Sequence, residues 1–550
     1  MNLGGRSAER ALLLLPIALA VATWFGFLAD RAPGTPAARD GFPLDDAWIH
    51  FVYARSLVDE GGFNYNAGVP ETGMTSPLWV VLAAGAHAVV GERPRAHDAS
   101  GRAGSAVETA PSAHTRDAAL ARNPAWRVVI GAKILSLLCG LAGVVVLYAL
   151  ARALGEGRAV ALAVACLAAL DPSMTFARAS GMEVPLFIAL VLGALLAAIR
   201  TRPILAGLAA GLSVVARPEG VVVLPIVVAL LARREVFRRP HALRTLALAS
   251  LLAILPALLY ALFCLSATGA PLPNTFYAKF TPRNPISGGT LETIAFGWRH
   301  YVAGNLPYFA LGVGAILAVA GGVRAASARN TAALLTLAAG PILFVSALAT
   351  RGFAPGHFFY WERWLIPAFP FFFLAMAIGL GAFRDAAAAI AARGDNARAR
   401  GLAGAALFAA LAALALWPLP QALRERSHLY AWNCQNIEEM NVALGRWIDA
   451  TLPRGTAVAV NDAGALRYFG NRPTVDLLGL NDHAILRRDP SLGVRPLADR
   501  GVEYFVIFPS WFRDLGRAIR LAPVHEVRSP HYTICEGEQD LMVVYKWERP

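Results

Sequence analysis

Long apolar runs alternate with short polar segments over the first 420 residues of the chain. Several runs fall short of the roughly 20 residues that a perpendicular helix needs to cross a membrane, but all are strongly apolar. They lie at 11–29, 128–150, 159–176, 183–199, 203–217, 220–232, 244–267, 303–323, 331–350, 363–384 and 401–420. The pattern predicts an α-helical polytopic membrane domain over residues 1–420, with about eleven transmembrane helices.

After Pro420 the hydropathy falls, and helix-like and strand-like segments alternate. Helical periodicity runs from Asn433 to Leu452, and short β-branched or aromatic runs follow at 456–460, 474–478, 504–508 and 541–545. Such alternation favours a partly parallel sheet. We expect residues 421–550 to form a soluble α/β domain, which is large enough to have a core of its own.

The apolar segment 77–90 sets the orientation of every later helix, because it either crosses the membrane or lies along its interface. If it lies along the interface, the arginines that flank the other spans gather on one side, namely Arg6, Arg10, Arg152, Arg158, Arg200, Arg202, Arg233, Arg234, Arg238, Arg239, Arg393, Arg398 and Arg400. Loops rich in arginine stay in the cytoplasm. We therefore expect a cytoplasmic N-terminus and a periplasmic C-terminal domain in a bacterial inner membrane.

Residues 30–127 form the first outer loop in this topology. The first span is followed by polar residues and not by a small-residue cleavage site, so we expect an uncleaved helix that tethers the loop. The stretch 91–127 is rich in alanine, serine, glycine and charged residues, which predicts a flexible insert without chemistry of its own. Interfacial helices and the candidate chemistry occupy the rest of the loop.

Composition supports membrane residence and argues against nucleic acid as a partner. Hydrophobic residues make up 56% of the chain, whose mean hydropathy is +0.50, values that exclude an ordinary soluble globule. The net charge of +13 comes from arginines scattered between apolar runs, a distribution that serves topology. Of the five cysteines, only Cys434 and Cys535 lie in the polar tail, where they form either an exported disulfide or two unrelated thiols.

Asp45 and Asp46 stand side by side in the first outer loop, within LeuAspAspAlaTrpIleHis. Paired carboxylates at a membrane surface are costly but suited to acid/base chemistry, so we place the active site there. The structural alternative is that both simply favour the positive N-terminus of a helix. His50 falls four residues after Asp46 on the same face, either as a partner or as an interface histidine without a role.

Metal binding is a second option for the same loop. Asp45, Asp46 and Glu71 are hard oxygen ligands of the kind that hold Mg²⁺ or Ca²⁺. No cysteine or histidine spacing suggests zinc. We do not expect an obligatory metal, and no other cofactor is indicated.

Several phrases in a fixed order carry a family resemblance. They are LeuAspAspAlaTrpIleHisPheValTyrAlaArgSerLeu, AsnTyrAsn and ThrSerProLeuTrp in the first loop, then SerGlyMetGlu (180–183), AlaArgProGluGly (216–220), ProAsnThrPheTyrAlaLys (273–279), AsnAspAlaGlyAlaLeuArgTyrPheGly (461–470) and ValAspLeuLeuGlyLeuAsnAsp (475–482). Together they resemble the GT-C superfamily of glycosyltransferases, in particular the mycobacterial β-arabinofuranosyltransferase branch that uses decaprenyl-phosphate arabinose. The 91–127 insert departs from that pattern.

The resemblance implies transfer of a sugar, arabinofuranose in the nearest-looking branch, from a polyprenyl-phosphate carrier to an envelope glycan or lipid acceptor. A carboxylate must take the proton of the acceptor hydroxyl while the anomeric carbon gains oxocarbenium character. One aspartate of the pair would be this base, and its neighbour would position donor, acceptor or a metal. The sequence does not say which is which.

The leaving lipid phosphate requires basic groups on the outer side. Lys279 is in the family-like phrase that also holds Tyr277, Arg217 lies at a helix break, and Arg363 begins a span. Each alternatively anchors the chain at the lipid headgroups. The acids near these cations, Glu183 and Glu219, orient them, bind sugar hydroxyls or are solvated helix-end residues.

Aromatic residues cluster at one membrane boundary, at Phe358, Phe359, Tyr360, Trp361 and Trp364. An aromatic belt is the favoured interpretation, and a surface for sugar or prenyl chains is the alternative. In the tail, polar residues of the family-like phrases either bind acceptor glycan or dock the domain onto the helical bundle. These residues are Asp462, Asp476, Asn481, Asp482 and His483.

Two other classes of function compete with an enzyme. A lipid-linked-sugar flippase or transporter would place ionisable residues near the middle of its spans and often shows internal repeats. Here the acids lie at helix ends or in outer loops, and no repeat is visible. A non-catalytic envelope scaffold would tolerate loss of both aspartates.

Overall fold

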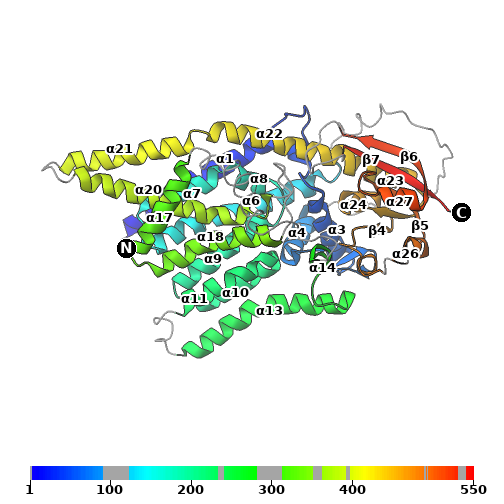
Figure 1. The fold of residues 1–550 in the computed structure, drawn as a ribbon, viewed down its shortest axis with the longest axis horizontal. Coiled ribbons are helices and arrows are strands. Elements are labelled where there is room, and N and C mark those ends of the chain that lie inside the picture. Colours follow the sequence, from blue (N-terminus) through cyan, green and yellow to red (C-terminus); the bar gives the residue numbers. More distant parts are fainter. Residues whose placement is uncertain are drawn as a thin grey trace.

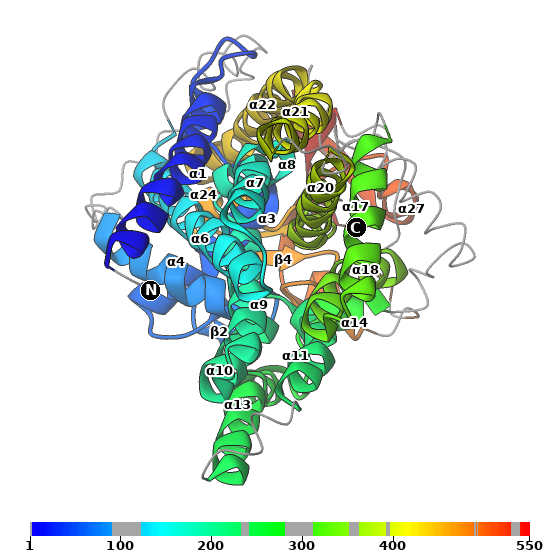
Figure 2. The ribbon, with the colours of Figure 1, turned by 90° about the vertical axis from the view of Figure 1, so that its left-hand side faces the viewer.

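The structure is a computed structural model, in which membrane helices form one end of the molecule and a mixed sheet forms the other (Figures 1 and 2). The N-terminus lies among the helices and the C-terminus at the sheet (Figure 1). The residues described are 3–90, 123–232, 241–280, 312–350, 362–391, 397–488, 491, 493–529 and 540–549.

Apolar helices make up the membrane domain because an α-helix satisfies all of its backbone groups internally. These are α1 (Leu3–Ala29), α6 (Trp126–Ala153), α7 (Arg158–Leu170), α8 (Pro172–Ala179), α9 (Val184–Ile199), α10 (Pro203–Ala216), η1 (Pro218–Val223), α11 (Leu224–Leu231), α13 (Ala242–Thr268), α17 (Val313–Ser327), α18 (Thr331–Thr350), η3 (Ile366–Ala368), α20 (Phe369–Ala391) and α21 (Ala397–Leu416).

The predicted count of about eleven membrane helices is not confirmed. Within the described residues, six helices are long and apolar enough to cross a membrane, or seven if α7 and α8, bent by 59°, are one broken span. Pro172 follows the Asp171 N-cap of α8 at this bend. Five other apolar helices, among them α4 (Pro77–Val90), α9 and α10, are shorter than 18 residues. Apolar runs in the sequence are therefore divided by prolines and caps that hydropathy alone does not register.

Small residues let some of these helices approach closely. A Cβ atom on Gly321 of α17 would come within 2.0 Å of the Ala375 carbonyl oxygen of α20. In the same crossing, a Cβ on Gly379 would meet the Leu317 oxygen at 1.9 Å. The two backbones therefore pack against each other through glycine, as is common between membrane helices.

The first loop folds into short elements that lie between the bundle and the sheet domain. They are α2 (Ala37–Asp40), α3 (Asp45–Asp59), β1 (Asn64–Asn66), β2 (Val69–Pro70) and α4 (Pro77–Val90), with α14 (Asn274–Phe280) beside them. Trp48 of α3 is fully buried, and its ring packs against Phe42, Tyr468 and Phe469 at centroid distances of 4.8 to 4.9 Å. This aromatic contact fixes α3 against the C-terminal part of the chain.

The predicted C-terminal sheet is confirmed, including its partly parallel character. Its strand order is β4-β3-β5-β7-β6, with β4, β3 and β5 parallel and the other pairs antiparallel. One strand was not expected, because Arg520–Arg528 carries Pro523 and several charges and forms an edge strand. The strands are β3 (Ala457–Val460), β4 (Thr474–Asp476), β5 (Val502–Ile507), β6 (Arg520–Arg528) and β7 (Leu541–Glu548).

A continuous helical segment joins the bundle to this sheet. It comprises α22 (Leu419–Ile437), a π-helical turn η4 (Glu438–Val442) and α23 (Ala443–Thr451), in agreement with the helical periodicity from Asn433 to Leu452. Short helices complete the domain, namely α24 (Ala465–Gly470), α25 (His483–Leu486), α26 (Arg495–Asp499) and α27 (Arg513–Ala518). The domain boundary at residue 421 stays a prediction.

Candidate active site

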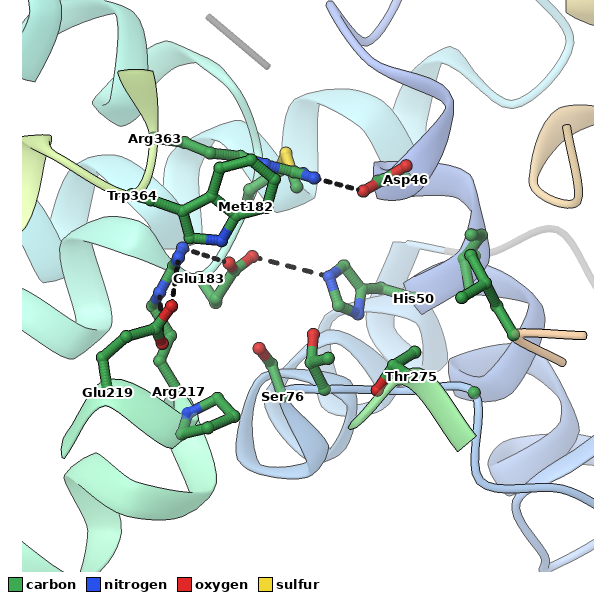
Figure 3. A pocket seen from close by; sticks show the side chains of 15 residues that line it. Asp46, His50, Ser76, Met182, Glu183, Arg217, Glu219, Thr275, Arg363 and Trp364 are labelled. Carbon is green, nitrogen blue, oxygen red and sulfur yellow. Dashed lines mark hydrogen bonds and ion pairs between the residues drawn. The ribbon is translucent and has the colours of Figure 1, made fainter. Parts of the chain in front are cut away.

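A polar pocket opens where several helix ends meet (Figure 3). It contains about 570 Å³ of empty space, part of it open to solvent. The start of α3, the start of α9, the break between α10 and η1, the start of α14 and the segment before η3 each contribute side chains. Those named below are Asp46, His50, Ser76, Met182, Glu183, Arg217, Glu219, Thr275, Arg363 and Trp364.

Asp46 faces this pocket and is paired with a cation. Its Oδ2 lies 2.5 Å from Nη2 of Arg363, which arrives from the segment leading into η3 (Figure 3). The carboxylate is 38% exposed, whereas the guanidinium is almost fully buried. A partly exposed carboxylate and a buried cation beside it thus occupy the same wall of the pocket.

Arg217 lies between two acids on the opposite side. Its Nη1 is 2.8 Å from Glu183 Oε1, and its Nη2 is 3.3 Å from Glu219 Oε1. His50 approaches the second oxygen of Glu183 at 3.5 Å (Figure 3). Both acids therefore contact the Arg217 guanidinium, and their role stays a prediction.

Asp45 points away from the pocket and holds the C-terminal domain. Its two carboxylate oxygens accept hydrogen bonds from the backbone N–H groups of Gly464, at 2.7 Å, and Ala465, at 2.8 Å. Desolvation and the nearby carboxylate of Asp462 raise the pKa of Asp45 well above its usual value, while the two N–H groups oppose the shift. Asp45 therefore contacts the C-terminal domain, whereas Asp46 faces the pocket.

Asp462 of the sheet domain lies close to the aspartate pair. Asn441 Nδ2 donates to its Oδ2 at 2.8 Å, and Asn461 Nδ2 donates to its Oδ1 at 2.9 Å. Burial and the negative charge of Asp46 raise the pKa of Asp462 to about 6, against those two hydrogen bonds. This carboxyl changes charge just below neutral pH, close to the candidate base.

Asp476 and Asn481 hold the sheet domain in place. Asp476 is fully buried and accepts hydrogen bonds from the backbone of Leu478 and from both the backbone and the side chain of Asn481. Asn481 in turn accepts from the Tyr53 hydroxyl of α3 at 3.0 Å. The Tyr53–Asn481 hydrogen bond thus links the sheet domain to α3, and a role in acceptor binding stays untested.

Glu71 and His483 meet away from the aspartate pair. Glu71 Oε1 is 2.8 Å from His483 Nδ1, and Glu71 Oε2 accepts from Asn274 Nδ2 at 2.9 Å. Burial raises the pKa of Glu71, although the contacts to His483 and Asn274 oppose this. Asp482 caps α25 and pairs with Arg500. The described residues contain no cluster of three or more histidine, cysteine or acidic side chains that would hold a metal, so the Asp45, Asp46 and Glu71 set is not assembled there.

Other predicted site residues lie outside the pocket or outside the described residues. The Cζ atom of Arg487 lies 6.0 Å from the centre of the Tyr277 ring, and Tyr277 does not line the pocket. The side chain of Lys279 and the cluster Phe358 to Trp361 lie outside the described residues. The same holds for Cys535, while its predicted partner Cys434 is buried in α22.

Trp364 lines the pocket and is 6% exposed, so it does not belong to a lipid-facing belt. Arg363 lies 4.7 Å above its ring centre. Of the alternatives for this residue, the contacts match a surface inside the site.

Ser76, Met182 and Thr275 line the pocket but were not predicted individually. All three lie in the phrases that carry the resemblance, so that signal was present in the sequence. Ser76 Oγ, Thr275 Oγ1 and His50 Nδ1 are buried and have no hydrogen-bond partner among the described residues. Buried polar atoms are normally paired, so these are suited to a polar ligand.

Comparison with known proteins bears on this site. The family described as dolichyl-phosphate-mannose-protein mannosyltransferase matches residues 119–260, and a domain of unknown function matches 433–545. No curated protein matches the chain in sequence. Among solved structures, ArnT from Cupriavidus metallidurans covers 98% of this chain and 98% of its own at 15% identity, with a TM-score of 0.56.

Two further structures were determined with lipid phosphates. ArnT bound to undecaprenyl phosphate shows 16% identity, 97% coverage of each chain and a TM-score of 0.53. The oligosaccharyltransferase AglB from Archaeoglobus fulgidus, in complex with an inhibitory peptide and a dolichol-phosphate, shows 12% identity over 92% of this chain and 70% of its own, with a TM-score of 0.53. The chain has the GT-C fold. This fold and the family match over residues 119–260 support the predicted enzyme class, a GT-C type glycosyltransferase.

Proposed function

We propose that the protein transfers a sugar from a polyprenyl-phosphate carrier to a hydroxyl of an envelope glycan or lipid, on the periplasmic face of a bacterial inner membrane. The observation that supports this most directly is Asp46, a partly exposed carboxylate paired with the buried Arg363 in a pocket at the helix ends. A base and a phosphate-binding cation are the two groups that this reaction requires.

Asp46 is the general base in this proposal. It takes the proton of the acceptor hydroxyl as the acceptor oxygen bonds to the anomeric carbon. The bond between that carbon and the donor phosphate oxygen breaks, and its electron pair leaves with the polyprenyl phosphate. Asp45, with both oxygens bound by Gly464 and Ala465, fixes the start of α3 and so positions Asp46.

Arg363 binds the leaving phosphate. A phosphate brought next to Asp46 competes for the same guanidinium, and a planar guanidinium with five donors binds phosphate oxygens well. Exchange of the carboxylate for the phosphate would leave Asp46 available as a base when the donor is present. Lys279, whose side chain lies outside the described residues, is retained as a second candidate for the phosphate.

Arg217 holds the two acids that bind sugar hydroxyls. Its guanidinium is already matched by Glu183 and Glu219, so its charge is largely neutralised. The carboxylates of these acids, with Ser76 Oγ and Thr275 Oγ1, supply a polar surface for the sugar. Trp364 supplies an aromatic face on which a sugar ring can stack.

Arabinofuranose is the sugar that we propose, on the resemblance of the sequence motifs. The test offers the purified full-length protein a panel of radiolabelled polyprenyl-phosphate sugars, including decaprenyl-phosphate arabinose, with an envelope extract as acceptor. One donor should lose its label to the acceptor, with release of an equal amount of polyprenyl phosphate.

The same assay separates the competing classes of function. Movement of donor across a proteoliposome membrane without release of polyprenyl phosphate would favour a flippase. Donor binding with neither movement nor release would favour a scaffold. Either result would contradict the proposed transfer, and consumption of a different donor would correct only the sugar.

A further inference from the structure

A second pocket lies on the far side of α3 from the candidate active site. It is bounded by the end of α4, the start of α6, and α23 with α24 of the sheet domain. It is larger than the first pocket, with about 1050 Å³ of empty space that opens to solvent. None of its lining residues lines the Asp46 pocket, so the two are separate sites.

Cationic side chains dominate the second pocket. Arg55 of α3, Arg127 of α6 and Arg446 of α23 all line it. The one acid in the lining, Asp449, has its Oδ1 3.1 Å from Nη1 of Arg472, so its charge is already compensated. Three guanidiniums from three different elements therefore line one pocket whose described lining holds a single acid, a composition suited to an anion.

Arg55 is the clearest sign that a ligand is expected. Its guanidinium lies 4.3 Å above the centre of the Tyr468 ring and donates one hydrogen bond, to the Tyr468 carbonyl oxygen at 2.9 Å. No carboxylate among the described residues forms an ion pair with it. Stacking on Tyr468 and one hydrogen bond hold the Arg55 guanidinium in a fixed orientation. Most of its N–H donors are left for another partner.

His87 supplies an independent observation in the same pocket. Its side chain lies on α4, is only 7% exposed, and has an Nδ1 atom without a hydrogen-bond partner among the described residues. Burial lowers the pKa of His87, so the ring is neutral at neutral pH. A neutral imidazole can donate to an anion without adding charge.

The depth of the pocket in the membrane limits what it binds. The candidate membrane span of α6 begins at Trp126, and Arg127 is the next residue. Arg127 also stacks on Trp126, with its Cζ 5.5 Å from the ring centre. A tryptophan at the end of a span marks the headgroup level, where the phosphates of lipids lie.

We propose that this pocket binds the phosphate group of an anionic lipid, through Arg55, Arg127 and Arg446. Arginine binds phosphate with two parallel hydrogen bonds, and three arginines distinguish an anionic lipid from one whose phosphate is offset by choline. Arg55 follows Asp46 by nine residues on α3, a rise of roughly 14 Å. The lipid site thus shares a helix with the candidate active site without touching its pocket.

The experiment uses the full-length protein in nanodiscs or mixed micelles with a defined lipid. Binding of phosphatidylglycerol and of phosphatidylcholine is measured for wild type, for the double variant Arg55→Gln Arg446→Gln, and for Arg495→Gln. Arg495 is the matched control, since it is an exposed arginine on α26 of the same domain. We expect wild type and control to prefer phosphatidylglycerol, and the double variant to bind it at least about tenfold more weakly.

Several outcomes would overturn the proposal. Equal binding of the two lipids by wild type, or an equal loss in the Arg495→Gln control, would show that no specific phosphate site exists. Displacement of phosphatidylglycerol by millimolar inorganic phosphate would assign the pocket to free phosphate. If the double variant does not fold, the single variant Arg127→Gln is tested in its place, because it leaves the contacts of Arg55 with Tyr468 intact. Unchanged phosphatidylglycerol binding in Arg127→Gln would contradict the proposal.

Discussion

Two adjacent aspartates with different surroundings define the candidate site at the scale of residues. Successive residues on a helix point about 100° apart, so Asp45 and Asp46 face different partners. Asp45 is bound by two backbone N–H groups of the sheet domain, and Asp46 by Arg363. The sequence predicted the aspartate pair but not the different contacts of its two members, because those contacts depend on which element packs on each face of α3.

Arg363→Gln should weaken binding of the polyprenyl-phosphate donor by about ten- to a hundredfold, as expected for a charged hydrogen bond to phosphate. Donor affinity of the purified variant is the measurement. Arg384→Gln serves as the control, since Arg384 lies on α20 and has an acidic partner of its own in Asp385. Unchanged donor affinity in Arg363→Gln would mean that another residue binds the phosphate, with Lys279 as the next candidate.

The transfer rate should fall as the pH drops through about 6, the pKa of Asp462. Above this pH the Asp462 carboxylate is ionised, and its negative charge makes the nearby Asp46 more basic; protonation removes that charge. A pH–rate profile measures the effect. Asp462→Asn has a neutral side chain of similar shape, so its rate should stay near the wild-type value at low pH and lack this inflection. An unchanged inflection in the variant would assign it to another group.

At the scale of elements, close helix crossings and short breaks explain where hydropathy failed. The sequence predicted most apolar segments, the helix around Asn433 to Leu452 and four of the five strands. It predicted that the runs at 203–217 and 220–232 are short, but it did not predict that α7 and α8 form a bent pair. These features depend on Asp171, Pro172 and Pro218, whose effect on a helix depends on the neighbours that satisfy the freed backbone groups.

Gly321→Ala should lower the thermal stability of the protein, because its Cβ would overlap the Ala375 oxygen across the α17–α20 crossing. Overpacking of this kind costs about 1–3 kcal/mol. Gly322→Ala, the matched neighbour, would meet no atom within 4 Å and should be neutral or slightly stabilising. Thermal unfolding in detergent compares the two. Equal effects would mean that the helices do not cross at Gly321.

At the scale of the whole molecule, the pocket is made from segments far apart in the chain. Asp46, Glu183, Arg217, Thr275 and Arg363 come from five segments that meet only in the fold. The order of the phrases in the sequence indicated which segments matter, through the resemblance, but not which side chains point inward. The orientation in the membrane and the sugar also remain predictions, since neither depends on the contacts within the chain.

The predicted orientation places the α17–α18 turn in the cytoplasm and the sheet domain outside. Ala328→Cys and Ala518→Cys introduce thiols at exposed positions in these two places, in a background with Cys535 replaced by serine. An impermeant maleimide applied to intact spheroplasts should label residue 518 and spare residue 328. The reverse pattern would overturn the orientation, and permeabilised cells, in which both react, are the control.

The central claim is that Asp46 is the base for sugar transfer, and a comparison of Asp46→Asn with Asp59→Asn tests it most directly. Both residues lie on α3, but Asp59 is exposed at its far end. Single-turnover transfer is measured with saturating donor and acceptor. We predict a loss of about a hundredfold or more in Asp46→Asn, with donor still bound, and an unchanged rate in Asp59→Asn. A folded Asp46→Asn variant that transfers sugar at the wild-type rate would contradict the account.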